Sequence, residues 1–164
     1  MSNLEFVNEI LVTHNKYRTD HQAPDLKISD KLNKIAQEWA ENLAKNDKAE
    51  HRPQNPYGEN IYMAGSTDPN WKLKGETVVK SWYDEIKLYK FGEPSPKKPD
   101  EVGHFTQLVW KGTTDLGIGE AKSKAGRVYV VCNYDPPGNV VNDRRAGQLN
   151  EFHGSTKYRK IPLE

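Results

Sequence analysis

The block Gly103–Trp110 contains the side chain whose role is hardest to explain by packing alone. Its histidine, His104, stands among apolar and aromatic neighbours, directly after the charged, proline-rich loop from Pro94 to Glu101. An imidazole in this setting can ligate a metal ion, transfer a proton or serve as a hydrogen-bonded core residue. Because most single histidines are structural, other residues must decide between these roles.

A carboxylate on an apolar helix face is the second candidate. A helix is predicted over about residues 75–89, and the stripe that contains Glu85 is otherwise formed by Val78, Trp82, Ile86 and Tyr89. Burying an ionised carboxylate without a partner costs several kcal/mol. Glu85 must therefore reach the edge of the stripe, hold a proton, or meet a cation or a hydrogen-bond donor.

Two further helices are needed to position these residues. A capping box of Ser2 and Glu5 begins the first helix, which is predicted to end at about Thr19. One face of it carries Leu4, Val7, Leu11, His14 and Tyr17. The second helix is capped by Ser29 or Asp30. Its apolar face is expected in the core and comprises Leu32, Ile35, Ala36, Trp39, Ala40, Leu43 and Ala44.

Three short strands are predicted between and after these helices. One is Gly58–Gly65, and the other two, Leu116–Ala121 and Arg127–Tyr134, are joined by a turn. Neither face of the last strand is plainly polar, so the sheet should be covered on both sides. The predicted fold is α+β, a three-layer α-β-α sandwich whose central short antiparallel sheet has helices on both faces. His51 falls on a loop between Asn46 and Tyr57 that contains two prolines.

Length and charge limit the classes of function. The 164 residues predict one domain, 1–164, with a core of about 3–142 and a polar tail, 143–164. With 24 basic and 23 acidic side chains the formal charge is +1, and no nucleic-acid partner is expected.

The compartment is predicted from the cysteine content and the amino terminus. Cys132 is the only cysteine, so no internal disulfide forms, and no Asn-x-Ser/Thr sequon is present. The first residues carry no signal peptide, and Ser2 excludes N-myristoylation. These features predict an intracellular protein, cytoplasmic or peripheral at a membrane.

Four segments in a fixed order resemble a known family. They are His14–Arg18, Gly58–Tyr62, Gly103–Trp110 and Cys132–Asn139. Together they span roughly residues 10 to 140 and resemble the CAP superfamily of cysteine-rich secretory proteins, venom allergens and plant pathogenesis-related proteins. Trp82–Lys87 and Gly138–Asn142 resemble its intracellular, Golgi-associated branch. The resemblance to that branch implies an anchor that is typically an amino-terminal myristoyl group, which Ser2 cannot carry.

The resemblance implies a central cleft with two histidines and two acidic residues, which match His51, Glu59, Glu85 and His104. His51 and His104 would be the metal ligands, with zinc as a non-catalytic cofactor and positions left for water. Glu59 and Glu85 would orient the imidazoles. The alternatives are a hydrogen-bonded cluster that binds no metal, and a Glu59 that only fixes the turn with Asn60. His14 and His21 are interpreted as structural or surface residues, and His153 lies in the tail.

Three classes of function remain open. In the first, the chain is a non-enzymatic binding protein; the resemblance implies sterol, fatty-acid or phosphoinositide ligands, Golgi or endosomal membranes, and a homodimer or other protein partners. The second is a zinc-dependent hydrolase. Against this second class, the sequence contains no His-Glu-x-x-His or Gly-x-Ser-x-Gly motif, and Ser66 and Ser81 have no evident base. Cys132 is interpreted as a core residue. The third is a dimeric scaffold with a vestigial cleft.

Overall fold

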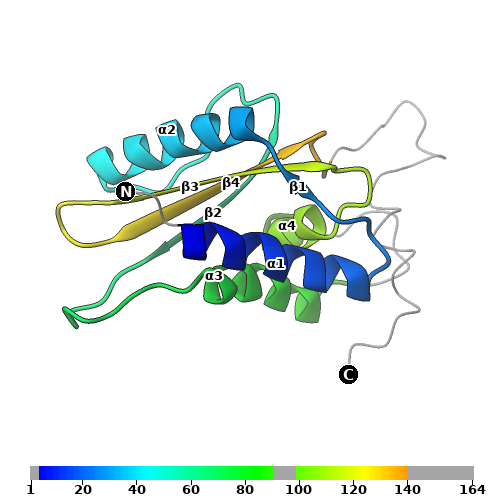
Figure 1. Cartoon of the computed structure of the whole chain (residues 1–164), viewed down its shortest axis with the longest axis horizontal. Coiled ribbons are helices and arrows are strands. Elements are labelled where there is room, and N and C mark those ends of the chain that lie inside the picture. The colour runs from blue at the N-terminus through cyan, green and yellow to red at the C-terminus, as the bar shows by residue number, and fades with distance from the viewer. Residues whose placement is uncertain (1–3, 91–98, 140–164) are drawn as a thin grey trace.

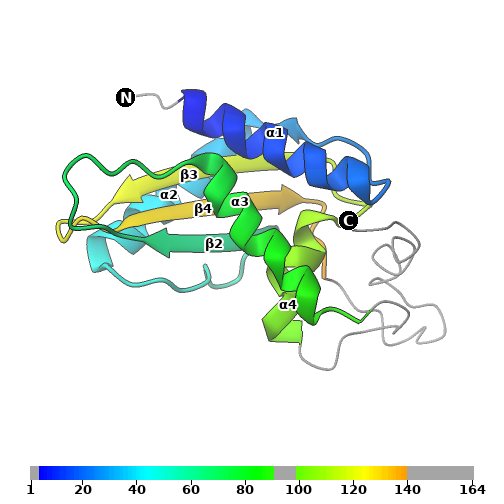
Figure 2. The ribbon, with the colours of Figure 1, turned by 90° about the horizontal axis from the view of Figure 1, so that it is seen from below.

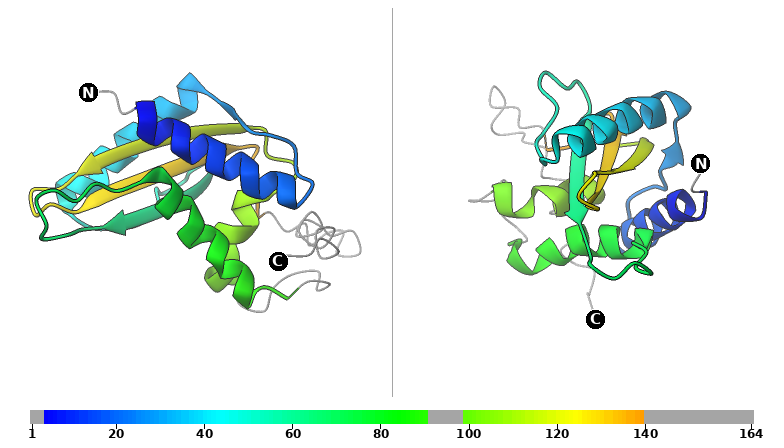
Figure 3. Two further views of the ribbon diagram at one scale, coloured as in Figure 1. Left: turned by 60° about the horizontal axis from the view of Figure 1, so that its bottom comes forward. Right: turned by 90° about the vertical axis from the view of Figure 1, so that its left-hand side faces the viewer.

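Helices cover both faces of a four-stranded sheet in this computed structural model, which describes residues 4–90 and 99–139 (Figure 1). One face is covered by α2 (Asp30–Asn46). The other is covered by α1 (Leu4–Asp20), α3 (Gly75–Tyr83) and α4 (Pro99–Leu108). Figure 3 shows the layers end-on, with the sheet between α2 and the other helices. The predicted α-β-α sandwich is confirmed.

The strand order is β1-β3-β4-β2. These strands are β1 (Lys27–Ile28), β2 (Gly58–Ala64), β3 (Asp115–Lys122) and β4 (Val128–Asp135). The pairs β3·β4 and β2·β4 are antiparallel, as predicted. The sequence did not predict β1, which pairs in parallel with β3 and makes the sheet mixed, because two residues are too few to show a period. At the opposite edge from β1, β2 forms the last strand.

Close packing of α2 on β3 fixes the upper layer. Ser29 caps the helix, its hydroxyl accepting from the backbone N of Leu32 at 3.2 Å. The backbone of α2 lies directly against Gly117 and Gly119, and a Cβ added at Gly119 would stand 2.4 Å from the N of Gln37. The two glycines therefore let the helix backbone approach the strand.

The buried face of α1 agrees only in part with the prediction, because His14 is buried and Val7, Leu11 and Tyr17 are partly buried against the core. Leu4 is 76% exposed, while the buried residues are Phe6, Ile10, Thr13, His14 and Arg18. Arg18 was not expected inside because an apolar pattern treats arginine as a surface residue. It is buried because its guanidinium donates to the carbonyl oxygens of Pro24, Leu108, Trp110 and Thr113 at 2.7–3.1 Å. Ser2, the predicted cap, lies outside the described residues.

Two predicted boundaries also change. The helix predicted over Gly75–Tyr89 ends at Tyr83 and continues as a 3₁₀ helix, η1, from Asp84 to Leu88. Of the predicted loop Pro94–Glu101, the part from Pro99 belongs to α4, and the rest lies outside the described residues, as does the tail 143–164. Over residues 4–90 and 99–139, none of the helices combines the length and apolar character needed to span a bilayer.

Candidate functional site

Glu85 on η1 meets hydrogen-bond donors from α4, which answers how a carboxylate can occupy an apolar stripe. Its Oε1 accepts from the backbone N of His104 at 3.0 Å and of Phe105 at 3.1 Å. Its Oε2 lies 2.7 Å from Nδ1 of the His104 ring. Three donors thus compensate the desolvation of this carboxylate. Of the three possibilities left open for Glu85, the structure shows the third, contact with hydrogen-bond donors.

His104 is held on two further sides. Its ring lies nearly parallel to the Trp82 indole, with centroids 5.9 Å apart and planes 15° apart. Trp82 is itself fixed to β2, because its Nε1 donates to the carbonyl of Ile61 at 3.3 Å. The carbonyl of His104 accepts from Asn60 Nδ2 at 3.1 Å. Both the ring and the backbone of His104 therefore have defined neighbours.

His51 lies on the predicted loop and pairs with Glu59 of β2. Its Nδ1 is 2.8 Å from Glu59 Oε1. The same oxygen accepts from the backbone N of Arg52 at 3.0 Å, and Oε2 accepts from Asn55 Nδ2 at 3.1 Å. The Glu59 side chain is 5% exposed and that of His51 is 69% exposed. Glu59 therefore does more than fix the turn with Asn60, because it fastens three positions of the loop.

The two pairs orient their imidazoles in the same way. An ionised carboxylate only accepts hydrogen bonds, so Nδ1 of each ring carries the hydrogen. When the ring is neutral, Nε2 keeps its lone pair and is the nitrogen free to bind a metal ion. The hydrogen bond to Glu59 raises the pKa of His51 above its ordinary value, an effect that burial partly opposes.

The pairs lie on the same part of the molecule. Glu59 belongs to the start of β2, and α4, which carries His104, contacts that strand (Figure 2). Asn60, the residue after Glu59, reaches the His104 carbonyl. Within residues 4–90 and 99–139, however, no three His, Cys, Asp or Glu side chains are placed to hold one metal ion. The four predicted residues thus form two pairs, and each pair offers one imidazole Nε2.

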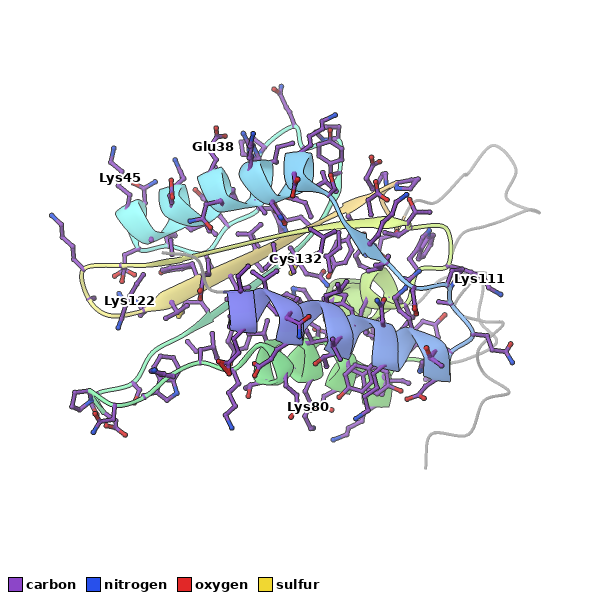
Figure 4. The ribbon with its side chains drawn as sticks, viewed as in Figure 1. Glu38, Lys45, Lys80, Lys111, Lys122 and Cys132 are labelled. Carbon is purple, nitrogen blue, oxygen red and sulfur yellow. The ribbon has the colours of Figure 1, made fainter. Side chains whose placement is uncertain are left out.

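The remaining candidate side chains of the described residues belong to the core. His14 and His21 are fully buried, and burial lowers the pKa of each to about 4. His14 donates from Nδ1 to the Ile10 carbonyl at 2.8 Å and accepts from Tyr134 Oη at 2.7 Å. Burial also raises the pKa of the Cys132 thiol, which lies between the layers (Figure 4). Cys132 is a core residue, as interpreted, and of the two alternatives left open for His14 and His21 the structure shows the buried, structural one.

Residues that support the pairs were missed by sequence reasoning. No periodic pattern marks Asn60 or Arg52, and the apolar pattern placed Trp39 on the core face of its helix without indicating its contacts with the loop. Asn60 is 1% exposed and joins Tyr134 to His104. Arg52 and Trp39 contact each other and hold the loop on either side of His51. Only the position of Arg52 next to His51 in the chain could have pointed to it.

Comparison with a solved structure first gives the class of protein. The chain shares its fold with the structure titled "Crystal structure of NaASP2 with Zn2+", with a TM-score of 0.68 and 26% identity. The match covers 85% of this chain and 83% of that one. The chain is therefore an α-β-α sandwich protein of the same fold as NaASP2, whose structure is named with Zn²⁺.

Sequence comparison then gives the family. Residues 11–134 match the family described as "CAP: Cysteine-rich secretory protein family", and the chain belongs to it. It is 39% identical over 142 residues to "Golgi-associated plant pathogenesis-related protein 1" of Homo sapiens, covering 85% of this chain and 88% of that protein. It is 34% identical over 140 residues to "Pathogenesis-related protein PR-1" of Medicago truncatula, covering 85% and 78%.

Proposed function

We propose that this CAP protein is a non-enzymatic binding protein with a divalent-metal site built on His51 and His104. The supporting observation is that both rings bind a glutamate through Nδ1, which leaves Nε2 as the ligand atom. Two imidazoles suit zinc, and a site with fewer than four protein ligands keeps positions for water or a partner group. Bound zinc would supply a fixed positive charge to an anionic group.

The proposed action is association with lipid, membrane or protein. A cavity of about 470 Å³, separate from both pairs, offers a place for an amphipathic ligand such as a sterol or an anionic lipid. Its apolar side chains are Phe6, Trp71, Leu73 and Val128, and lysines and glutamates surround them. The name of the human relative supports a peripheral position at Golgi membranes. A homodimer is part of the same proposal.

The contacts of the candidate nucleophiles favour binding over hydrolysis. The hydroxyl of Ser81 donates to the Val78 carbonyl at 2.7 Å, and that of Ser66 accepts from the N of Asp68 at 3.1 Å. Neither serine bonds to a histidine of the described residues that could act as its general base. Cys132 is buried, and its raised pKa keeps the thiol protonated at neutral pH.

Calorimetric titration with Zn²⁺ tests the metal site. Wild type should bind one ion per chain, and His51→Ala and His104→Ala should each weaken binding by at least about thirtyfold, or ~2 kcal/mol. His153→Ala removes a histidine that the proposed site does not use and is the matched control. Equal affinity in the wild type and both site variants would contradict the proposal.

Liposome co-sedimentation tests the association. Vesicles with and without anionic lipid or sterol, at low salt, should pellet wild type in a lipid-dependent way, and the titration variants should show whether zinc contributes. Absence of pelleting in every vesicle would remove the lipid part. Zinc-dependent turnover of a peptide or ester library, lost in His104→Ala, would instead establish a hydrolase.

A further inference from the structure

We propose that Arg52 and Trp39 are positioning residues that hold His51 against Glu59 and thereby set the affinity of the metal site. This inference rests on the proposed function, because it concerns how one of its two ligands is kept in place. Neither residue touches the metal ion in this proposal. Both act through the backbone of the loop that carries His51.

His51 cannot hold its own position. Its side chain is 69% exposed, and within the described residues its one hydrogen-bond partner is Glu59. A side chain this exposed loses rotamer freedom when it is fixed in one geometry. The orientation of the ring must therefore be defined by the loop backbone on either side, at Glu50 and Arg52.

Both flanking residues are fastened to α2. On one side, the indole Nε1 of Trp39 donates to the carbonyl of Glu50 at 3.0 Å. On the other, the Arg52 guanidinium lies over the Trp39 ring, 5.8 Å from its centroid. The same indole therefore contacts the loop before and after His51. Such an arrangement limits how far the loop can move away from the helix.

The Arg52 side chain adds directional contacts. Its Nη1 donates to the Ile35 carbonyl at 3.3 Å, and its Nη2 pairs with Glu38 at 2.5 Å. Glu38 lies on the outer surface of α2 (Figure 4), so this ion pair alone should contribute little. The backbone N of Arg52 meanwhile donates to Glu59 Oε1, the oxygen that accepts from His51. Arg52 thus joins α2 to the carboxylate that orients the ligand.

Zinc affinity in a double-mutant cycle tests this role. Arg52→Ala should weaken Zn²⁺ binding about tenfold, as the loss of outer partners of metal ligands commonly does. In the His51→Ala background the same substitution should have almost no effect, because it acts through His51. Trp39→Phe, which keeps an aromatic face but loses the indole N–H, should weaken binding about threefold.

Arg127→Ala is the matched control. Arg127 also pairs with a carboxylate next to α2, but this carboxylate, Asp47, caps the C-terminal end of the helix. Arg52 instead contacts α2 further toward its N-terminal end, at Ile35, Glu38 and Trp39. Substitution of Arg127 should leave zinc affinity unchanged. An equal loss in Arg127→Ala and Arg52→Ala, or a loss in Arg52→Ala that persists in the His51→Ala background, would overturn the inference.

A measurement without metal separates this inference from the proposed function. Exchange of the backbone amide at position 52, which bonds to Glu59 in the native protein, should accelerate at least about fivefold in Arg52→Ala and Trp39→Phe, as local opening becomes easier. It should not change in Arg127→Ala. If wild type fails to bind zinc, this result alone decides whether the residues position the loop. Unchanged exchange in both variants would refute the positioning role.

Discussion

The pair Glu85–His104 and the pair Glu59–His51 reach the same ring orientation by different means. Glu85 accepts from a helix, whose backbone donors at His104 and Phe105 are set by α4 itself. Glu59 accepts from a loop, whose donors are held by contacts to α2. The exposure of the side chains also differs between the pairs. Glu59 is more buried than Glu85, at 5% against 20% exposed, whereas His51 is more exposed than His104, at 69% against 32%.

This difference shows that carboxylate burial and ligand rigidity are separate properties. Glu59, the better buried glutamate, holds His51, the more exposed histidine, because the donors to Glu59 lie on an irregular loop. The His104 side is built into the core through Trp82 and Asn60. We therefore expect the His104 side to contribute to stability and the His51 side to contribute mainly to ligand binding.

Removal of the Glu85 and Glu59 carboxylates should give the largest difference in stability between the two sides. Glu85→Ala should lower the free energy of unfolding by about 3 kcal/mol, because α4 loses three bonds to a charged acceptor near buried Phe105. Glu59→Ala should cost about 1.5 kcal/mol, since its loop donors can bind water instead. Urea unfolding at neutral pH measures both. An equal or larger loss in Glu59→Ala would break the comparison.

Lowering the pH should destabilise the His104 side of the protein through protonation of His14. The network from His14 through Tyr134 and Asn60 ends at the His104 carbonyl. The pKa of His14 is about 4 in the folded protein against an ordinary 6.5, so the unfolded chain binds more protons between these values. Stability should therefore fall as the pH drops from about 6.5 toward 4, by about 2 kcal/mol at pH 5 from His14 alone.

The matched control for acid is His51→Ala. The pKa of His51 is raised, so its contribution to stability is present at low pH and lost as pH rises, opposite in sign to that of His14. The free energy of unfolding of His51→Ala, measured in urea, should therefore still fall between pH 7 and pH 5. His21, with a pKa also lowered to about 4, acts in the same direction as His14. A stability that does not change over this range would contradict the role given to the buried histidines.

Replacement of one asparagine on each side should give the smallest difference in stability. Asn60→Ala removes the donor shared by His104 and Tyr134 and should cost about 1.5 kcal/mol, because Asn60 is fully enclosed. Asn55→Ala removes one donor to Glu59 on the loop and should cost about 0.5 kcal/mol or less. Thermal unfolding of the two variants side by side measures this. Equal losses would mean that the loop is as strongly held as α4.

The sequence predicted what depends on periodicity. The layers and the helix with the buried face Leu32 to Ala44 followed from apolar spacing, which also placed Glu85 on an apolar stripe and so raised the question of its partner. The burial of Arg18 in α1 did not, because its guanidinium donates to four backbone carbonyls, three of them from segments distant in the chain. The contact of His51 with Glu59 could not be derived from spacing either, since it joins an irregular loop to a strand. The resemblance alone indicated those two residues.

Histidine side-chain NMR of the wild type tests most directly whether both rings present Nε2 to one ligand. At pH 8 the long-range ¹H–¹⁵N spectrum should show His51 and His104 as Nδ1–H tautomers, each bonded to its glutamate. One equivalent of Zn²⁺ should then shift the Nε2 resonances of both rings together and leave His14 and His21 unchanged. An Nε2–H tautomer in either ring, or zinc that shifts neither of them, would contradict this description of the site.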